Sequence, residues 1–273
     1  MIDEPLGDME LAVVDRPRLR SLLPKEHGAY AQLGVPMLAA LTAGAPGASA
    51  LLLATSAWAF FLAHEPALVL LGRRGERARA EHAERAVTRL LTLGFAGAVL
   101  GALGLLLAPS VARWASLAVA ALAIVFALLV ALGDERSTAG EILAAITFAG
   151  AAFPVGVASG IGGGTAARAW LVWSLGLVAV VIPLRSIVAN RRVTVPVGIR
   201  ALPAGLAVGI GLALWGPVLG WLELVALAPL VIASAWLGIA RPPPRRLRQV
   251  GWTIVVSTLL TGCILVIAAK APV

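Results

Sequence analysis

An imidazole and a carboxylate are adjacent in a strongly apolar part of the chain. His64 and Glu65, followed by Pro66, lie in the stretch WAFFLAHEPALVLLGRR at residues 58–74. A charged group inside a membrane-length apolar segment costs roughly 2.5–3.5 kcal/mol on insertion scales, so such a group usually has a functional or a pairing role. The pair therefore predicts either the lining of a binding site or a structural bond to a neighbouring helix.

A second carboxylate–imidazole pair, Glu26 and His27, stands at the start of the first apolar segment. A glutamate at a helix start also fits a simpler role, because it interacts favourably with the free amides and the helix dipole. Two imidazoles and two carboxylates at one level of the membrane could instead relay protons. Their spacing matches no known metal-ligand motif, so we predict no metal site at these residues.

Arginines mark the ends of two apolar segments. Arg73 and Arg74 close the segment that carries His64. Arg185 and Asn190 lie near the end of a later segment. Guanidinium groups bind phosphate oxygens in a bidentate geometry, which predicts a site for an anionic head group. The alternative is that these residues only flank the membrane, as snorkelling and the positive-inside rule require.

Two further carboxylates are predicted to be structural. Thr138 and Glu141 have the spacing of a capping box at a helix start. Glu223 follows Trp221 by two residues and is expected at the membrane interface.

The elements that must position these groups are transmembrane helices. Of the 273 residues, 60% are hydrophobic and only 13% are charged, and the mean hydropathy is +0.93. So few charges do not cover the surface of a soluble domain of this size. A helix needs about 20 apolar residues to cross about 30 Å of hydrocarbon, and runs of this length recur along the chain. We predict an all-α, polytopic membrane protein.

The apolar segments predict a bundle of nine transmembrane helices, at about residues 24–45, 47–71, 88–108, 111–132, 139–161, 168–188, 200–218, 221–240 and 250–269. Residues 24–273 form a single membrane domain, and residues 1–23 form a flexible cytoplasmic arm. Residues 73–89, where arginine alternates with glutamate, could form a short surface helix. Gly34 and Pro36 are expected to interrupt the first span, and Pro66 to loosen the second.

The distribution of basic residues predicts a cytoplasmic N-terminus. With this orientation, all of the 22 lysines and arginines fall on the cytoplasmic side except Arg113, Arg168 and Lys270. The net charge of +8 therefore orients the chain and does not indicate a nucleic-acid partner. The single cysteine, Cys263, excludes an intrachain disulfide.

Two strings, PKEHGAYAQLGVP (24–36) and HEPALVLLGRRG (64–75), resemble those of the YwiC-like family of bacterial membrane proteins. The resemblance implies a multi-pass protein of the bacterial plasma membrane. More remotely, nine spans with polar clusters at the cytoplasmic ends of the second and sixth are similar to the UbiA-type intramembrane prenyltransferases. Those enzymes hold magnesium with aspartate-rich motifs at these two places. Neither place has an aspartate here, so the sequence does not support a magnesium site and leaves the cofactor unknown.

These resemblances and residues together predict a UbiA-like bundle with a cytoplasm-facing intramembrane pocket between the second and sixth spans. The pocket would bind or modify an isoprenoid, quinone-like or other anionic lipid. Head-group binding is predicted for Arg73, Arg74, Arg185 and Asn190. Proton transfer is predicted for Glu26, His27, His64 and Glu65. Two alternatives stay open: a transporter or exporter of a small solute, which prolines in several spans would suit, and a non-catalytic assembly protein.

Overall fold

The computed structural model of the chain describes residues 27–189, 197–240, 242–243 and 246–271, and the predicted cytoplasmic arm lies outside these residues. The described residues are helical and contain no strand. The helices are α1 His27–Ala43, α2 Ala48–Leu70, α3 Glu76–Leu107, α4 Ser110–Leu132, α5 Thr138–Gly150, α6 Ala152–Ala158, α7 Gly163–Ala189, α8 Val197–Trp215, α9 Trp221–Ala240 and α10 Leu247–Lys270, with a 3-10 turn, η1, at Gly216–Val218. The predicted all-α class is confirmed.

Within the described residues, 7 helical segments are long and apolar enough to cross a membrane: α2, α3, α4, the α5–α6 segment Thr138–Ala158, α7, α9 and α10. α1 has 17 residues, and the described apolar stretch of α8, Gly205–Leu214, is shorter still. These two helices coincide with the predicted first and seventh spans. A multi-pass helical membrane protein is confirmed, and the number of nine crossings stays a prediction.

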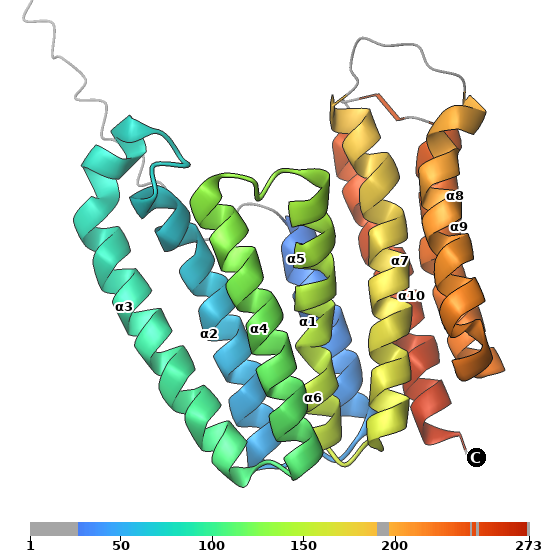
Figure 1. Cartoon of the computed structure of the whole chain (residues 1–273), viewed down its shortest axis with the longest axis horizontal. Helices are drawn as coiled ribbons and strands as arrows, with labels where there is room; N and C mark the ends of the chain where they lie inside the picture. Colours follow the sequence, from blue (N-terminus) through green and yellow to red (C-terminus); the bar gives the residue numbers. More distant parts are fainter. Residues whose placement is uncertain (1–26, 190–196, 241, 244–245, 272–273) are drawn as a thin grey trace, which may run out of the picture.

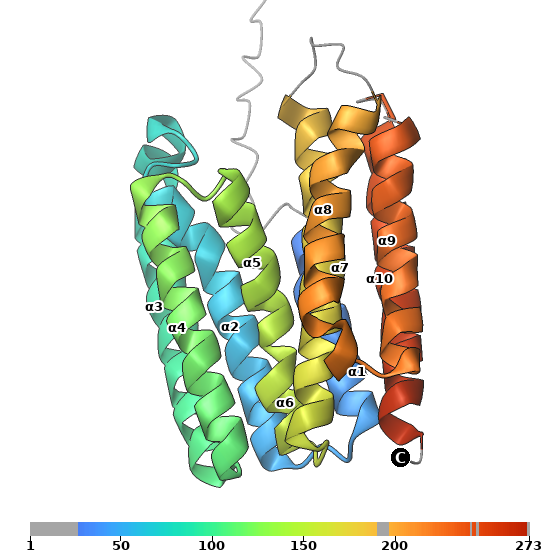
Figure 2. The same cartoon turned by 45° about the vertical axis from the view of Figure 1, so that its right-hand side comes forward.

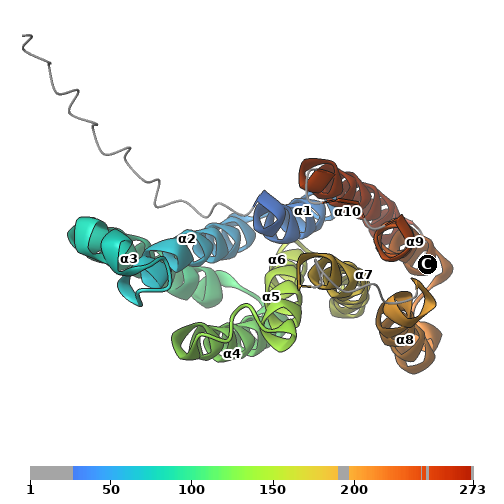
Figure 3. The same cartoon turned by 90° about the horizontal axis from the view of Figure 1, so that it is seen from above.

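The helices stand roughly parallel in two rows (Figures 1 and 2). Seen from above, α3, α2, α1 and α10 form one row, and α4, α5 with α6, α7 and α8 form the other (Figure 3). α6 joins the rows because it packs on α1, α2 and α4, and α9 packs on both α7 and α10. We call the end with the turns 71–75 and 133–137 the upper end, and the end with the turns 44–47 and 159–162 the lower end.

Two apolar cores hold the bundle together. One lies among α7, α9 and α10 around Trp173, Leu177 and Leu230, and the other lies among α1, α2 and α6 around Met37 and Phe61. α3 and α4 contribute little to either, since only 11% of the apolar window of each is buried. In a membrane protein such surfaces face lipid.

Residues 73–89 do not form a separate surface helix. α3 runs without a break from Glu76 to Leu107, over 32 residues. At 1.5 Å per residue this is about 48 Å, which exceeds the roughly 30 Å of a hydrocarbon core. No glycine or proline precedes Gly94 in α3, so nothing in the sequence stops the helix where its charges begin.

Prolines act differently from the prediction. α1 continues through Pro36 and α2 through Pro66, so the expected interruption of the first span is wrong. The break occurs in the predicted fifth span, where α5 ends at Gly150 and α6 begins at Ala152. Pro154 has no N–H to donate to the carbonyl of Gly150, which explains the break there.

Glycines allow α3 to approach α2 closely. The Ser56 hydroxyl of α2 donates a hydrogen bond of 2.7 Å to the carbonyl of Gly97 in α3. A Cβ added to Gly101 would lie 2.8 Å from Ser56 Oγ, and one added to Gly104 would lie 3.1 Å from the backbone nitrogen of Leu53. Small residues at helix contacts are typical of membrane bundles, where close packing replaces the hydrophobic effect.

Replacing Gly104 by leucine is expected to push α3 away from α2 and to lower the free energy of unfolding by about 1–3 kcal/mol, the usual cost of overpacking. Gly94 of the same helix is the matched control, because a Cβ added there meets nothing within 4 Å. Thermal unfolding of the purified protein in detergent measures the difference. Equal melting temperatures for Gly104→Leu and Gly94→Leu would show that this contact is not tight.

Candidate functional site

The turn after α2 folds the chain back over the helix. The backbone N–H of Gly72 donates to the carbonyl of Val69 at 3.0 Å, and that of Arg73 donates to Leu68 at 2.9 Å. Gly72 and Gly75 have φ values of 71° and 94°, which favour glycine. The turn therefore places the side chain of Arg74, the second of the two residues between these glycines, next to the last turns of α2.

Arg74 forms a two-pronged ion pair with Glu65. Its Nε donates to Oε1 at 2.8 Å and its Nη2 donates to Oε2 at 2.5 Å. Glu65 is only 3% exposed, whereas the Arg74 side chain is 23% exposed. A buried carboxylate is tolerated when its oxygens are hydrogen-bonded to an opposite charge. Glu65 thus finds its partner nine residues further along the chain rather than on a distant helix.

His64 points to another helix. Its ring stacks on Phe126 of α4, with the centroids 5.6 Å apart and an interplanar angle of 29°. Phe126 contacts Phe148 of α5 at 5.9 Å, and Phe148 contacts Phe61 of α2 at 5.5 Å. The imidazole therefore lies at the end of a row of aromatic rings that joins α2, α4 and α5.

Arg73 fixes the end of α4. Its Nη2 donates to the carbonyl of Ala131 at 2.7 Å. Gly133, with φ of 88°, ends α4 against the same guanidinium, and a Cβ there would lie 2.5 Å from Arg73 Nη1. The positive φ favours glycine at this position, and a side chain there would displace the Arg73 guanidinium.

Arg185 of α7 binds the start of α5. Its Nη1 lies 2.9 Å from Glu141 Oε1 and also donates to the carbonyl of Arg136. The predicted capping box of Thr138 and Glu141 is wrong, because Ser137 is the N-cap and accepts a 3.0 Å hydrogen bond from the amide of Gly140. Glu141 is thereby left to pair with Arg185.

The structure brings the predicted arginines to one turn. Arg73 binds Ala131 and Arg185 binds Arg136, and these two carbonyls are five residues apart, so they lie within about 18 Å of each other. At the upper end, α2 and α7 are therefore connected through side-chain bonds to the α4–α5 turn and to Glu141 of α5.

Part of the predicted site falls outside the described residues. Glu26 and Asn190 lie outside them, and His27 begins α1 with a side chain that the structure does not describe. Their predicted roles stay predictions. Among the residues that are described, no group of three or more histidine, cysteine, aspartate or glutamate side chains is placed to hold a metal ion.

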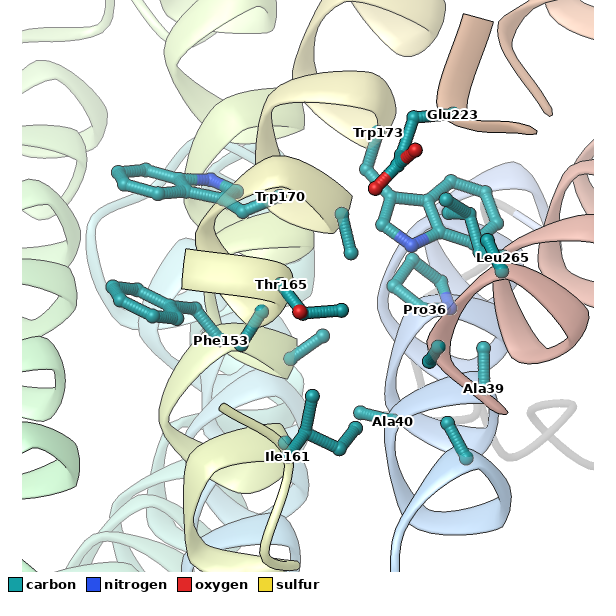
Figure 4. Close-up of a pocket in the computed structure, with 17 residues that line it drawn as sticks. Pro36, Ala39, Ala40, Phe153, Ile161, Thr165, Trp170, Trp173, Glu223 and Leu265 are labelled. Atoms are coloured by element: carbon teal, nitrogen blue, oxygen red, sulfur yellow. The ribbon is translucent and has the colours of Figure 1, made fainter. Parts of the chain in front are cut away.

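A second polar group, at the lower half of the bundle, was missed by the sequence reasoning. Arg168 at the start of α7 donates from Nε to Glu223 Oε1 at 2.8 Å. Glu223 was predicted at the interface, but its side chain is only 10% exposed. It lines a partly open cavity of about 40 Å³ among α1, α6, α7, α9 and α10 (Figure 4). The sequence did contain a signal for this pair. Arg168 and Glu223 carry opposite charges and lie near the starts of two predicted spans, the sixth and the eighth, that begin on the same side of the membrane.

Fold and site together define an all-helical, multi-pass membrane protein with a buried ion pair at each end. The family model described as YwiC-like protein matches residues 23–156, so the resemblance predicted from the two strings is confirmed and this part of the chain is similar to that family. The matched region contains Glu65 with Arg74 and His64 with Phe126. No curated protein and no solved structure matches the chain.

Replacing Arg74 by glutamine is expected to lower the free energy of unfolding by about 3–5 kcal/mol, because the Glu65 carboxylate would remain buried without its partner. The double variant Glu65→Gln with Arg74→Gln is expected to recover much of this loss, since no charge then stays buried. Chemical or thermal unfolding in detergent measures both.

The matched control is Arg77→Gln, which removes a guanidinium that is 93% exposed near the start of α3. This change is expected to leave the melting temperature where it is. If Arg74→Gln is no more harmful than Arg77→Gln, the Glu65–Arg74 pair does not stabilise the fold.

Proposed function

We propose that the chain is a nine-span protein of the bacterial plasma membrane, with a cytoplasmic N-terminus, that binds an anionic lipid at its upper end. The lipid would be an isoprenoid, a quinone-like compound or another anionic amphiphile. The observation that carries the proposal is that Arg73 and Arg185 bind the carbonyls of Ala131 and Arg136, on either side of the turn between α4 and α5. Arg74, next to Arg73 in the chain, is held by Glu65, the neighbour of His64.

The arginines suit a phosphate or another anionic head group. Arg73 is exposed, and the Arg185 side chain is 25% exposed. Both described bonds of Arg185 come from Nη1, whereas a guanidinium carries further N–H donors on Nε and Nη2. A head group at this turn would thus meet charged donors that are already held in place, which lowers the entropic cost of binding.

The lipid would reach the site from the side. α3 and α4 meet at their shared lower turn and separate toward the upper end (Figure 1), since α3 packs chiefly on α2 and α4 on α5 and α6. His64 and Phe126 join α2 to α4 on this side. Aromatic rings at this depth would contact the apolar part of an amphiphile whose head group lies at the arginines.

A more specific version of this proposal is that the protein modifies the bound lipid, as a UbiA-type prenyltransferase does. Of the two predicted proton-transfer groups beside the arginines, His64 is the better supported. Both oxygens of Glu65 accept hydrogen bonds from Arg74, so that carboxylate serves as a counter-ion in the observed arrangement. The lower cavity favours a second candidate, the transport of a small solute.

Native mass spectrometry of the purified protein tests the proposal. The wild type is expected to retain an anionic lipid, and Arg185→Gln combined with Glu141→Gln is expected to weaken its retention about tenfold, the effect of losing one charge-assisted hydrogen bond. The double change avoids leaving Glu141 without its partner.

Arg113→Gln is the matched control, because Arg113 also donates to helix-end carbonyls, Leu106 and Ala108, but at the lower end. It is expected to retain the lipid fully. Equal retention in the Arg185 and Arg113 variants, or no retained anionic lipid in the wild type, would contradict the proposal.

A further inference from the structure

The lower cavity has the size of a very small molecule. Its volume is about 40 Å³. By this measure one water-sized group needs roughly 10–15 Å³, so the cavity accommodates about three non-hydrogen atoms. Alanines from several helices supply 8 of the 17 residues of the walls, among them Ala40 of α1 and Ala269 of α10. Larger side chains at these positions would leave no space.

Arg168 does not line the cavity itself, but its guanidinium group binds two polar side chains that do. Arg168 donates to Glu223 Oε1 at 2.8 Å and to Thr165 Oγ1 at 3.2 Å. In the described part of the chain, no hydrogen bond is formed by Glu223 Oε2, and the Thr165 hydroxyl donates to no described acceptor. The cavity therefore presents a carboxylate oxygen and a hydroxyl that retain hydrogen-bonding capacity.

Aromatic rings complete the lining. Trp173 lies beside Glu223 at one end of the cavity, and Ile161 lies at the other (Figure 4). Trp170 stacks on Phe153 at 5.8 Å, and its indole N–H donates to the carbonyl of Ile146 at 3.2 Å. Indole faces next to a buried carboxylate attract organic cations.

We propose that this cavity binds a small protonated amine. The ammonium group donates to Glu223 Oε2 and to Thr165 Oγ1 near the Trp173 ring, and the short alkyl group lies among the alanines. An anion would face the Glu223 carboxylate, and a bare metal ion would leave the methyl-lined part empty. Since Arg168 already neutralises much of the Glu223 charge, binding is weak and suits a ligand that exchanges readily.

The site is separate from the arginines of the upper end. Its ligand is defined by the ammonium group, which a free amine or the head group of an amine lipid can supply. Either source places the same chemistry in the same cavity.

Thermal unfolding of the full chain in detergent, with methylammonium chloride compared with equal sodium chloride, tests this site. At ten times the dissociation constant, methylammonium is expected to raise the melting temperature of the wild type by about 3 °C, and sodium is not. Ala40→Leu fills the cavity without touching the Glu223–Arg168 pair, and it is expected to abolish the rise. Ala121→Leu on the exposed face of α4 is its control and keeps the rise.

Glu223→Gln is the second variant and is also expected to abolish the rise, with the exposed Glu84→Gln as its control. If Glu223→Gln does not fold, Ala40→Leu alone decides the result. A rise that persists in Ala40→Leu, an equal rise with sodium chloride, or no rise with methylammonium in the wild type overturns the proposal.

Nanodiscs distinguish the two sources of the ammonium group. If a phosphatidylethanolamine bilayer removes the methylammonium response that a phosphatidylglycerol bilayer allows, the natural ligand is the lipid head group. If both bilayers allow the response, the ligand is a free amine. A missing response in phosphatidylglycerol counts against the site itself.

Discussion

The bidentate pairing of Glu65 with Arg74 is the interaction on which the upper end depends. The carboxylate is buried on α2, and its partner is reached only if the chain reverses at Gly72 and Gly75. That reversal also places Arg73 at the end of α4 and starts α3 at a fixed position beside α2. The pairing of one buried carboxylate thus fixes the positions of α2, α3 and α4 relative to one another at the upper end.

Two further carboxylates of the described helices also pair with an arginine, one of them on a half-exposed side chain. Glu141 meets Arg185 at the upper end, and Glu223 meets Arg168 toward the lower end. These two pairs join different helices, α5 with α7 and α7 with α9, whereas Glu65 pairs within one helix–turn unit. Because a low-dielectric interior penalises a lone charge, such pairs favour one arrangement of the helices over others.

Helix positions could be predicted closely where apolar runs are bounded by turn residues. The segments 111–132 and 221–240 differ from α4 and α9 by one residue at most. The start of α3 could not be found in this way, because a change from apolar to charged residues marks the membrane boundary and not the end of a helix. The hydropathy of a segment indicates whether it lies in the membrane. The ends of a helix are indicated only by helix-breaking or capping residues.

The sequence identified the charged residues of the site, but it did not predict which of them would pair with each other. His64 and Glu65 point to different partners because neighbouring residues of a helix project about 100° apart. Arg74 becomes the partner of Glu65 through two glycines with positive φ, and Arg185 becomes the partner of Glu141 through the packing of α5 on α7. The lower cavity is built from alanines of several helices, which carry no signal in sequence.

The orientation of the bundle decides whether the arginines of the upper end meet the cytoplasmic leaflet, as the lipid-binding proposal requires. Single cysteines at Arg77, just after the upper turn, and at Ser110, at the lower turn between α3 and α4, report it in a chain with Cys263→Ser. With a membrane-impermeant maleimide on intact cells, we expect Ser110→Cys to react at once and Arg77→Cys to react only after permeabilisation. Labelling of Arg77→Cys in intact cells, with Ser110→Cys protected, would contradict the proposed orientation and the lipid site that rests on it.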